Sequence, residues 1–279
     1  MRARADLHTH SSASDGSDHP SELVKRADEL KLGAIALTDH DSLDGINEFM
    51  EADVSEELIR VPGLEISCEH EHSEVHILGY FVPLDSKALN EKLEYLRKSR
   101  HERLPKMIQK LCDLGIDVTT DELYEDLNGV SSPGRPHVAK LLVKKGVVNS
   151  TMEAFQKYLA SDRPAYVKKE RMQAIKAIRL LKTIGAVPVV AHPLTIKVAD
   201  LRGLMEKFVS EGLAGVEVEY DYAFMGMNRS PDEVRKIIQG LGVIQTGGSD
   251  YHGTFHFTKL GSITVPIEVV DEIQRSAKN

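Results

Sequence analysis

Two histidines near the start of the chain, His8 and His10, are separated by one residue, and Asp15 follows them in a turn rich in serine and glycine. In a β-strand, side chains two residues apart project from the same face. Imidazole is the commonest metal ligand in proteins, and carboxylate oxygens bind many of the same ions. An isolated His-X-His pair is more often an accident of a surface or a core, so this segment indicates a metal site only if later segments supply further ligands.

Later segments do supply such residues, each beside or within a predicted strand. They are His40 after residues 34–38, Glu65 within 59–67, His76 within 75–81, His192 after 186–191, and Asp250 with His252 after 242–246. A charged side chain inside an apolar run is costly unless it is paired or coordinated, which favours a ligand role for Glu65 and His76. Mixed nitrogen and oxygen ligands suit zinc, manganese or iron, and these candidates exceed what one tetrahedral ion uses. We therefore expect more than one divalent ion.

Apolar strands and helical periods alternate in the N-terminal and C-terminal parts of the chain. Helices are predicted from Pro20 to Leu30, over residues 42–52 and over residues 172–184. Alternation of strand and helix is typical of an α/β fold with a parallel sheet, in which chemistry gathers at the carboxyl ends of the strands. We expect the candidate ligands to meet at the strand ends of one such sheet.

Between these parts, residues 85–169 have a helical period without strands, beginning with Leu89, Leu93 and Leu96. We interpret them as a helical insertion that caps the active site of a main domain formed by residues 1–84 and 170–279. The basic residues from Arg97 to Lys106 could face a substrate, but a charge run on a helix is usually a solvated face, and we favour that interpretation.

The composition limits the class of protein. The 279 residues are 41% hydrophobic and 28% charged, which is ordinary for a globular chain. A net charge of −8 argues against coating of long nucleic acid, but a small phosphorylated substrate held by local cations is compatible with it. No apolar run reaches membrane-spanning length and no signal-peptide core is seen, so a cytoplasmic location without a membrane partner is expected. Cys68 and Cys112 are too few for a disulfide framework.

Taken together, the motifs resemble the PHP (polymerase and histidinol phosphatase) family of metal-dependent phosphoesterases. The resemblance is carried by residues 6–11 with 14–16, 37–41, 63–65, 76–80, 191–193 and 248–252, in the order of the family and over essentially the whole chain. It implies a distorted (β/α)7 TIM-like barrel with a cluster of two to three divalent ions (Mn, Zn or Fe) at one end. No ligand of the family pattern is missing.

The resemblance also implies how the ligands are shared. His8, His10, Glu65 and Asp250 would hold one ion, and Glu65 would bridge to a second ion held by His76 and His192. The third ion would be held by Asp15, His40 and His252. Asp39 or Asp41 is expected to hold these ligands in position without binding an ion itself.

The helical insertion is similar to that of stand-alone bacterial PHP enzymes acting on nucleoside 3',5'-bisphosphates and short 5'-phosphorylated oligonucleotides. Residues 134–139 and 163–167 carry this similarity. Arg135 has the planar donor fork that binds phosphate through two hydrogen bonds, and His137 can add a hydrogen bond or a charge. We expect both to bind substrate, the alternative being that Arg135 is a local structural cation.

The implied activity is hydrolysis of a phosphate ester by a metal-bridging hydroxide, with Glu65, Asp250 and His192 as catalytic candidates. His192 or His252 could assist the leaving group, although ligation would consume the imidazole lone pair. Other hypotheses are a phosphatase of another small metabolite such as histidinol phosphate, an amidohydrolase or deaminase, and a non-catalytic PHP module. The additional set Asp15, His40, His76 and His252 argues against an amidohydrolase, and the complete ligand set argues against a non-catalytic module. The oligomeric state is not predicted.

Overall fold

The computed structural model describes residues 3–127, 130–253 and 258–277. The chain forms two compact units, one made of the residues up to Glu91 and from Arg171 onward, the other of Lys92–Glu170. The first unit contains every described strand, and the second is helical. No helix among the described residues is long and apolar enough to cross a membrane.

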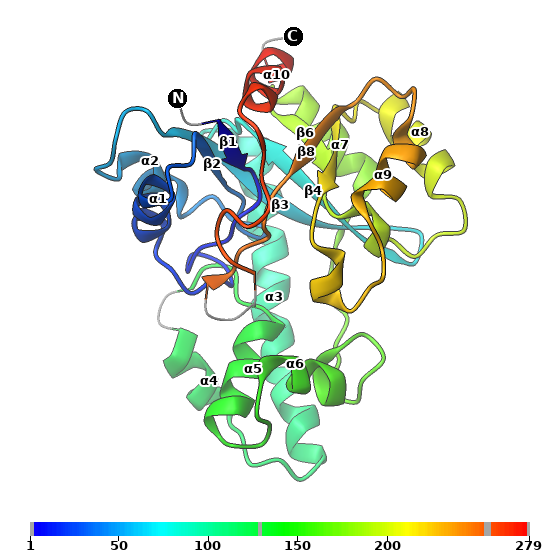
Figure 1. Cartoon of the computed structure of the whole chain (residues 1–279). Helices are drawn as coiled ribbons and strands as arrows, with labels where there is room; N and C mark the ends of the chain where they lie inside the picture. Colours follow the sequence, from blue (N-terminus) through cyan, green and yellow to red (C-terminus); the bar gives the residue numbers. More distant parts are fainter. Residues whose placement is uncertain (1–2, 128–129, 254–257, 278–279) are drawn as a thin grey trace. The chain divides into compact units, whose positions relative to one another are not determined.

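The sheet of the first unit closes into a barrel (Figure 1). Its strands follow the order β8 (Ile244–Gly247), β7 (Gly215–Glu219), β6 (Val187–Val190), β4 (Ser73–Tyr80), β3 (Ile59–His70), β2 (Ala34–Leu37) and β1 (Arg4–Asp6). Beyond the ends of β1 and β8, the amide of Leu7 donates to the carbonyl of Gly247 at 3.2 Å and Thr9 pairs in parallel with Tyr251. These contacts join the two edges, so the expected seven-stranded (β/α)7 TIM-like barrel is confirmed.

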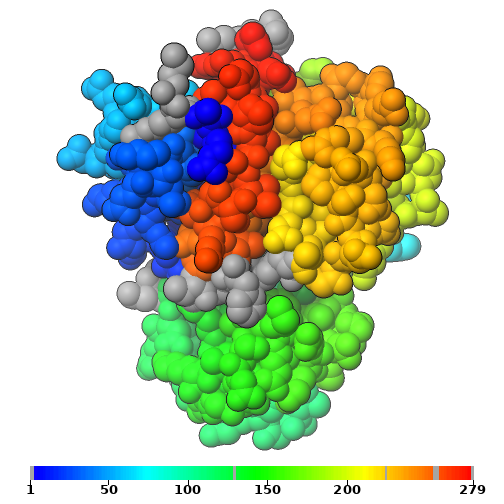
Figure 2. Space-filling view, in the orientation of Figure 1, coloured from blue at the N-terminus to red at the C-terminus, as the bar shows by residue number. Residues whose placement is uncertain are grey.

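The sequence at the closing seam permits the edges to approach closely. A Cβ atom on Gly248 would stand 2.3 Å from the amide nitrogen of His8, which is too close for any residue but glycine. In Figure 2, the N-terminal segment in blue and the C-terminal segment in red lie side by side in this unit. The short strand β9 (Val265–Pro266) adds to the same region by pairing antiparallel with β1.

Besides the short β9, strand β4 contradicts the expected parallel sheet, because it is antiparallel to both of its neighbours. Only Glu71 and His72 separate β3 from β4, and two residues can connect antiparallel strands but not parallel ones. His76 consequently lies in the first half of its strand, not at its end. Reversal of the strand brings that beginning to the barrel end where the parallel strands finish.

Alternation along the strands separates the barrel interior from its helical cover. On β2, Ala34 and Ala36 belong to the interior cluster with Val61 and Tyr80, whereas Ile35 and Leu37 pack with the helices outside. Those helices are α1 (Pro20–Glu29) and α2 (Ile46–Glu51) near β2 and β3, α7 (Ala174–Thr183) over β3, β4 and β6, α8 (Leu201–Ser210) beside α9 (Pro231–Ile238), and α10 (Glu268–Ala277) against β6 and β8. The two-residue strand β5 (Met172–Gln173) pairs with β3.

The second unit has its own apolar core. This unit comprises most of α3 (Lys87–Asp113), then α4 (Thr120–Leu127), α5 (Arg135–Lys144) and α6 (Thr151–Ala154), which continues into the π-helical turn η1 (Phe155–Leu159). Leu104, Met107 and Leu111 of α3 pack there with Val138 and Leu142 of α5. The helical nature predicted for this segment follows from that continuous buried stripe.

Candidate metal centre

Four side-chain atoms from three segments converge at the end of the barrel. The Nε2 atoms of His8 and His10 are 3.1 Å apart, and Oδ1 of Asp250 is 3.3 Å from the first and 3.2 Å from the second. Oε2 of Glu65 is 3.6 Å from Nε2 of His8 and 3.4 Å from Nε2 of His10. Ligands about 2.0–2.1 Å from a zinc ion stand about 3.3–3.4 Å apart at the corners of a tetrahedron. The two imidazole nitrogens therefore stand at ligand spacing from each other and from both carboxylate oxygens.

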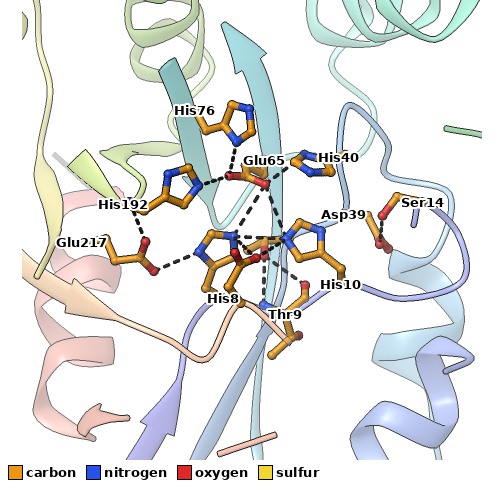
Figure 3. Close-up of polar contacts among 12 residues, drawn as sticks. His8, Thr9, His10, Ser14, Asp39, His40, Glu65, His76, His192 and Glu217 are labelled. Atoms are coloured by element: carbon orange, nitrogen blue, oxygen red, sulfur yellow. Dashed lines mark hydrogen bonds and ion pairs between the residues drawn. The ribbon is translucent and has the colours of Figure 1, made fainter. Parts of the chain in front are cut away.

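Glu65 presents its other oxygen to a second group of ligands, as Figure 3 shows. Oε1 lies 2.8 Å from Nδ1 of His76 and 3.1 Å from Nε2 of His192. Oε2 also lies 2.9 Å from Nδ1 of His40. A carboxylate with one oxygen on each side of a cluster is suited to bridge two cations.

Asp15 stands at the centre of a third group. Its Oδ1 is 3.4 Å from Nε2 of His252 and 3.9 Å from Nδ1 of His10, and its Oδ2 is 3.8 Å from Nε2 of His40. One ligand atom from each of these four residues lies within 4.8 Å of the others. The family resemblance implied that Asp15, His40 and His252 share an ion, and the structure places the second nitrogen of His10 beside them.

Two buried imidazole nitrogens have no hydrogen-bond partner among the residues that the structure describes, although acceptors are near them. They are Nδ1 of His10 and Nδ1 of His40, and the latter approaches Glu65 to 2.9 Å without hydrogen-bond geometry. An orphaned buried polar atom is costly in a folded protein. Ligands of a common ion approach one another in this way because the ion, not a proton, lies between them. The residues thus fit a metal cluster on the evidence of their own geometry.

Charge at the cluster is also consistent with cations. Burial alone raises the pKa of Glu65, but His40, His76 and His8 hold that pKa well below its ordinary value. Burial likewise opposes ionisation of Asp15 and Asp250, yet neighbouring imidazoles hold the pKa of each carboxyl well below its usual range. The carboxylates stay ionised, and positive charge must balance them.

Two opposite effects on the imidazole pKa occur at the cluster. Burial, with the nearby His252, lowers the pKa of His10 to about 3, so its ring is neutral and has a lone pair to share. Burial also opposes the charge of His76 and His252, but the carboxylates beside them raise the pKa of each to about 9. In the protein alone, these rings carry the positive charge that metal ions supply when they bind.

A frame of hydrogen bonds holds the segments that carry the cluster. Asp39 accepts from the amide and hydroxyl of Ser11 at 2.8 and 2.6 Å and from the hydroxyl of Ser14 at 2.5 Å. Asp41 accepts from the amide of Ser67 at 2.7 Å. These two residues, predicted to support the ligands, hold the backbone beside Asp15 and Glu65 through these bonds.

Three further supports were missed in the sequence. Asp6 accepts from the amide and hydroxyl of Ser249, next to Asp250, at 2.9 and 2.6 Å. Tyr220 donates its hydroxyl to Oδ2 of Asp250 at 2.8 Å, and Glu217 contacts His8 and His192 (Figure 3). Asp6 and Tyr220 have no spacing signal, whereas Glu217 interrupts the apolar run of β7 and could have been singled out as Glu65 was.

All nine residues predicted as ligands lie in this cluster, and all belong to the first unit. They are His8, His10, Asp15, His40, Glu65, His76, His192, Asp250 and His252. Two of them, His192 and Asp250, have positive φ angles of 29° and 51°. Strained backbone of this kind is retained at sites where the surroundings determine the conformation.

Arg135 and His137 belong to the second unit, at the start of α5. The guanidinium of Arg135 lies over the rings of Phe155 and Tyr166, 5.5 and 5.8 Å from their centroids, and it donates to the carbonyl of Leu159 at 3.4 Å. The ring of His137 is buried, and its Nδ1 accepts from the amide of Gly134 at 3.1 Å. Both side chains are therefore held in fixed orientations.

Comparisons with known proteins agree with this geometry. A match to the PHP domain family covers residues 6–161. A 5'-3' exoribonuclease of Haemophilus influenzae is 29% identical over 98% of this chain and 97% of its own length. A 3',5'-nucleoside bisphosphate phosphatase of Chromobacterium violaceum is 30% identical over 90% of this chain and 87% of its own length.

Solved structures give the same result. One from Bifidobacterium adolescentis, assigned to the metal-dependent phosphoesterases, has a TM-score of 0.88 and 27% identity over 98% of this chain and 96% of its own. Another, described as an amidohydrolase from Chromobacterium violaceum, has a TM-score of 0.83 and 29% identity over 99% of each chain.

Proposed function

The chain belongs to the PHP domain family, and from this premise we propose that it is a phosphoesterase that removes the 3'-phosphate of nucleoside 3',5'-bisphosphates. Short 5'-phosphorylated oligoribonucleotides are the second substrate class. The observation that carries the proposal is the pair of Nε2 atoms of His8 and His10, each at ligand spacing from Oε2 of Glu65 and Oδ1 of Asp250, beside two further ligand groups.

We assign the ligands as two to three ions require. His8, His10, Glu65 and Asp250 would hold the first, Glu65 would bridge to a second held also by His76 and His192, and Asp15, His40 and His252 would hold the third. Divalent manganese, zinc or iron bound there would provide a hydroxide nucleophile near neutral pH and neutralise charge on the phosphoryl oxygens.

The protein's own groups prepare this chemistry. Glu65 and Asp250 remain ionised despite burial, because imidazoles surround them. The hydroxyl of Tyr220 fixes one oxygen of Asp250 and leaves Oδ1 directed at His8 and His10. The ring of His192 contacts Thr195 through Nδ1 at 3.1 Å, so that Nε2 faces Glu65. Such preorganisation keeps the ligand atoms in place before substrate arrives.

The substrate class rests on the relatives and on the second unit. One relative is named a 3',5'-nucleoside bisphosphate phosphatase, so its substrate carries two phosphates, and the other is named a 5'-3' exoribonuclease, so its substrate is RNA. Arg135 and His137 bind a phosphate other than the one cleaved. A guanidinium supported by Phe155 and Tyr166 has few rotamers to lose when it binds, which favours that role.

The test compares three substrates at equal metal loading: adenosine 3',5'-bisphosphate, AMP and a 5'-phosphorylated RNA dinucleotide. The bisphosphate should be hydrolysed with the highest kcat/KM and release its 3'-phosphate. Arg135→Ala should reduce kcat/KM for the bisphosphate by roughly 10- to 1000-fold, the scale of a lost charge-assisted bidentate pair, with little effect on AMP. Lys144→Ala, on the same helix and paired with Asp126 at the surface, is the matched control. Equal slowing of both substrates by Arg135→Ala would contradict the assignment of a remote phosphate.

Two other activities remain to be compared. The structural relative described as an amidohydrolase favours testing an amide or aminopurine substrate, and histidinol phosphate tests a phosphatase of another metabolite. The third ligand group around Asp15 argues for phosphate oxygens, because more than one cation can then contact the substrate. Release of ammonia, or a preference for histidinol phosphate over the bisphosphate, would overturn the proposed substrate.

A further inference from the structure

Strand β7 carries none of the nine predicted ligands, yet it places a fully buried carboxylate beside two of them. Glu217 has no exposed surface, and Figure 3 shows it facing His8 and the backbone of His192. The two ligands that it contacts come from other parts of the barrel, because His8 follows β1 and His192 follows β6. A buried acidic residue requires donors for both of its oxygens.

The first donor is the ring of His8. Its Nδ1 is 2.9 Å from Oε1 of Glu217. Because a carboxylate only accepts hydrogen bonds, this contact requires the proton on Nδ1. In the neutral ring, which is the form that can bind a metal ion, the other nitrogen, Nε2, then has its lone pair directed toward His10, Glu65 and Asp250.

The second donor is the backbone of His192, whose amide is 2.7 Å from Oε2 of Glu217. His192 has φ 29° and ψ 60°, a left-handed conformation that a residue with a side chain adopts at a cost. The turn places Nε2 of His192 at 3.1 Å from Glu65. The hydrogen bond to Glu217 therefore stabilises the strained residue in the orientation that the centre needs.

The strand itself is irregular where Glu217 occurs. Glu217 pairs with Thr246, whereas Glu219 pairs with the next residue, Gly247, so β7 contains one additional residue at this point. A bulge of this kind redirects side chains and is common at barrel rims beside active sites. Local geometry thus agrees with a special orientation of Glu217.

We infer that Glu217 is a positioning residue of the metal centre, whose two oxygens fix the tautomer of His8 and the strained turn of His192. This inference rests on the proposed metal site. It goes beyond the ligand set, because Glu217 acts through His8 and His192. It also explains how β7 contributes to a centre to which it gives no ligand.

The isosteric change Glu217→Gln tests the inference because glutamine keeps the volume and loses one acceptor. If the amide oxygen faces Nδ1 of His8, the amide NH2 opposes the N–H of His192. If the NH2 faces His8, the ring must move its proton to Nε2 and can no longer ligate. Either arrangement removes one oriented ligand, so we expect Mn²⁺ to bind about 10- to 100-fold more weakly, the usual scale for residues behind metal ligands.

Affinity is measured from the electron paramagnetic resonance signal of free Mn²⁺, with no substrate present. Glu219→Gln is the matched control, because Glu219 is on the same strand and its carboxylate pairs with Arg235 outside the cluster. The control should bind Mn²⁺ as the wild type does. In Glu217→Gln, saturating Mn²⁺ should restore most of kcat, which a general packing defect would not show.

A second measurement needs no variant. In the Zn²⁺-loaded wild-type protein, ¹⁵N nuclear magnetic resonance should find the proton of His8 on Nδ1. A proton on Nε2, or wild-type Mn²⁺ affinity in Glu217→Gln, would overturn the positioning role while leaving the phosphoesterase proposal intact. A wild-type protein that binds metal but hydrolyses no phosphate ester would overturn the proposed function alone, and one that binds no Mn²⁺ would overturn both.

Discussion

Two sets of buried carboxylates at the same barrel end behave in opposite ways. In the inner set, Glu65, Asp15 and Asp250 face imidazoles, which hold the pKa of each carboxyl well below its ordinary value despite burial. In the outer set, Asp6 and Asp39 face serine hydroxyls and backbone amides. Burial raises the pKa of each to about 6, and the hydrogen bonds only partly oppose it.

The opposite pKa shifts of the two sets indicate two different roles for a buried carboxylate. An inner carboxylate is useful as a charge, because it is one of the groups that attract cations. An outer carboxylate is useful as a pair of acceptors that hold a loop in place. Replacement of the acid by its amide removes the charge but keeps the shape, so it should harm the first set more than the second.

Removal of metal is expected to have the largest effect. Dialysis against a chelator should abolish phosphate release, because the inner carboxylates then have only protonated imidazoles to balance them. Added Mn²⁺ should restore the activity, and elemental analysis should find manganese, zinc or iron in the active protein. Full activity in a protein without transition metal would contradict the assignment of the centre.

Glu65→Gln should come next, with kcat/KM lowered by roughly 10³-fold or more, the scale of disabling a group that acts as part of a catalytic unit. The amide cannot bridge two cations with two anionic oxygens, and the metal content should fall. Glu69→Gln is the control, because Glu69 is on the same strand and contacts Gln173 away from the cluster. Wild-type rates in Glu65→Gln at wild-type metal content would refute the bridging role.

Asp6→Asn should have an intermediate effect, mainly on stability. Oδ1 of Asp6 accepts from the amide of Ser249, and Oδ2 accepts from the amide of Gly261 at 2.8 Å, so both oxygens face N–H donors that cannot reverse. An amide NH2 must oppose one of them, and the free energy of unfolding in urea should fall by about 1–3 kcal/mol, as for an unsatisfied buried group. An unchanged urea midpoint would show that Asp6 is not needed as a double acceptor.

Asp39→Asn should have the smallest effect. Oδ1 can keep the amide of Ser11 and the hydroxyl of Ser14, while the hydroxyl of Ser11 can rotate to accept from the new NH2. We expect a change in the free energy of unfolding of about 1 kcal/mol or less, the net worth of one hydrogen bond. Asp39→Ala should lower the free energy of unfolding by clearly more in the same urea titration. Equal losses of stability in both variants would mean that Asp39 stabilises the fold through its charge and not through its hydrogen bonds.

Much of the centre could be predicted from the sequence because its residues follow the ends of predicted strands. His8 and His10 have strand spacing, and Asp250 and His252 repeat it, so their positions at one barrel end follow from the closed sheet. Glu65 was singled out as a charge inside an apolar strand, and the structure places it between the ligand groups. Whether these residues bind metal remains a prediction for the experiments above.

The direction of β4 and the role of Glu217 were not predicted, for different reasons. Hydrophobic alternation indicates a strand but not its direction, although the two residues between β3 and β4 leave no room for a parallel crossover. Glu217 has no partner near it in sequence, since His8 is 209 residues away. Only the closed barrel brings the two together.

The seam between β1 and β8 determines when the centre can exist during folding. His8 and Asp250 lie on opposite sides of this seam and near opposite ends of the described chain. Bringing them together therefore costs more loop-closure entropy than most other contacts in the protein. A nascent chain that lacks residues 244–252 lacks Asp250 and His252, two of the nine predicted ligands, and has no closed rim. A metal ion that binds only the closed barrel would stabilise the closed barrel by mass action.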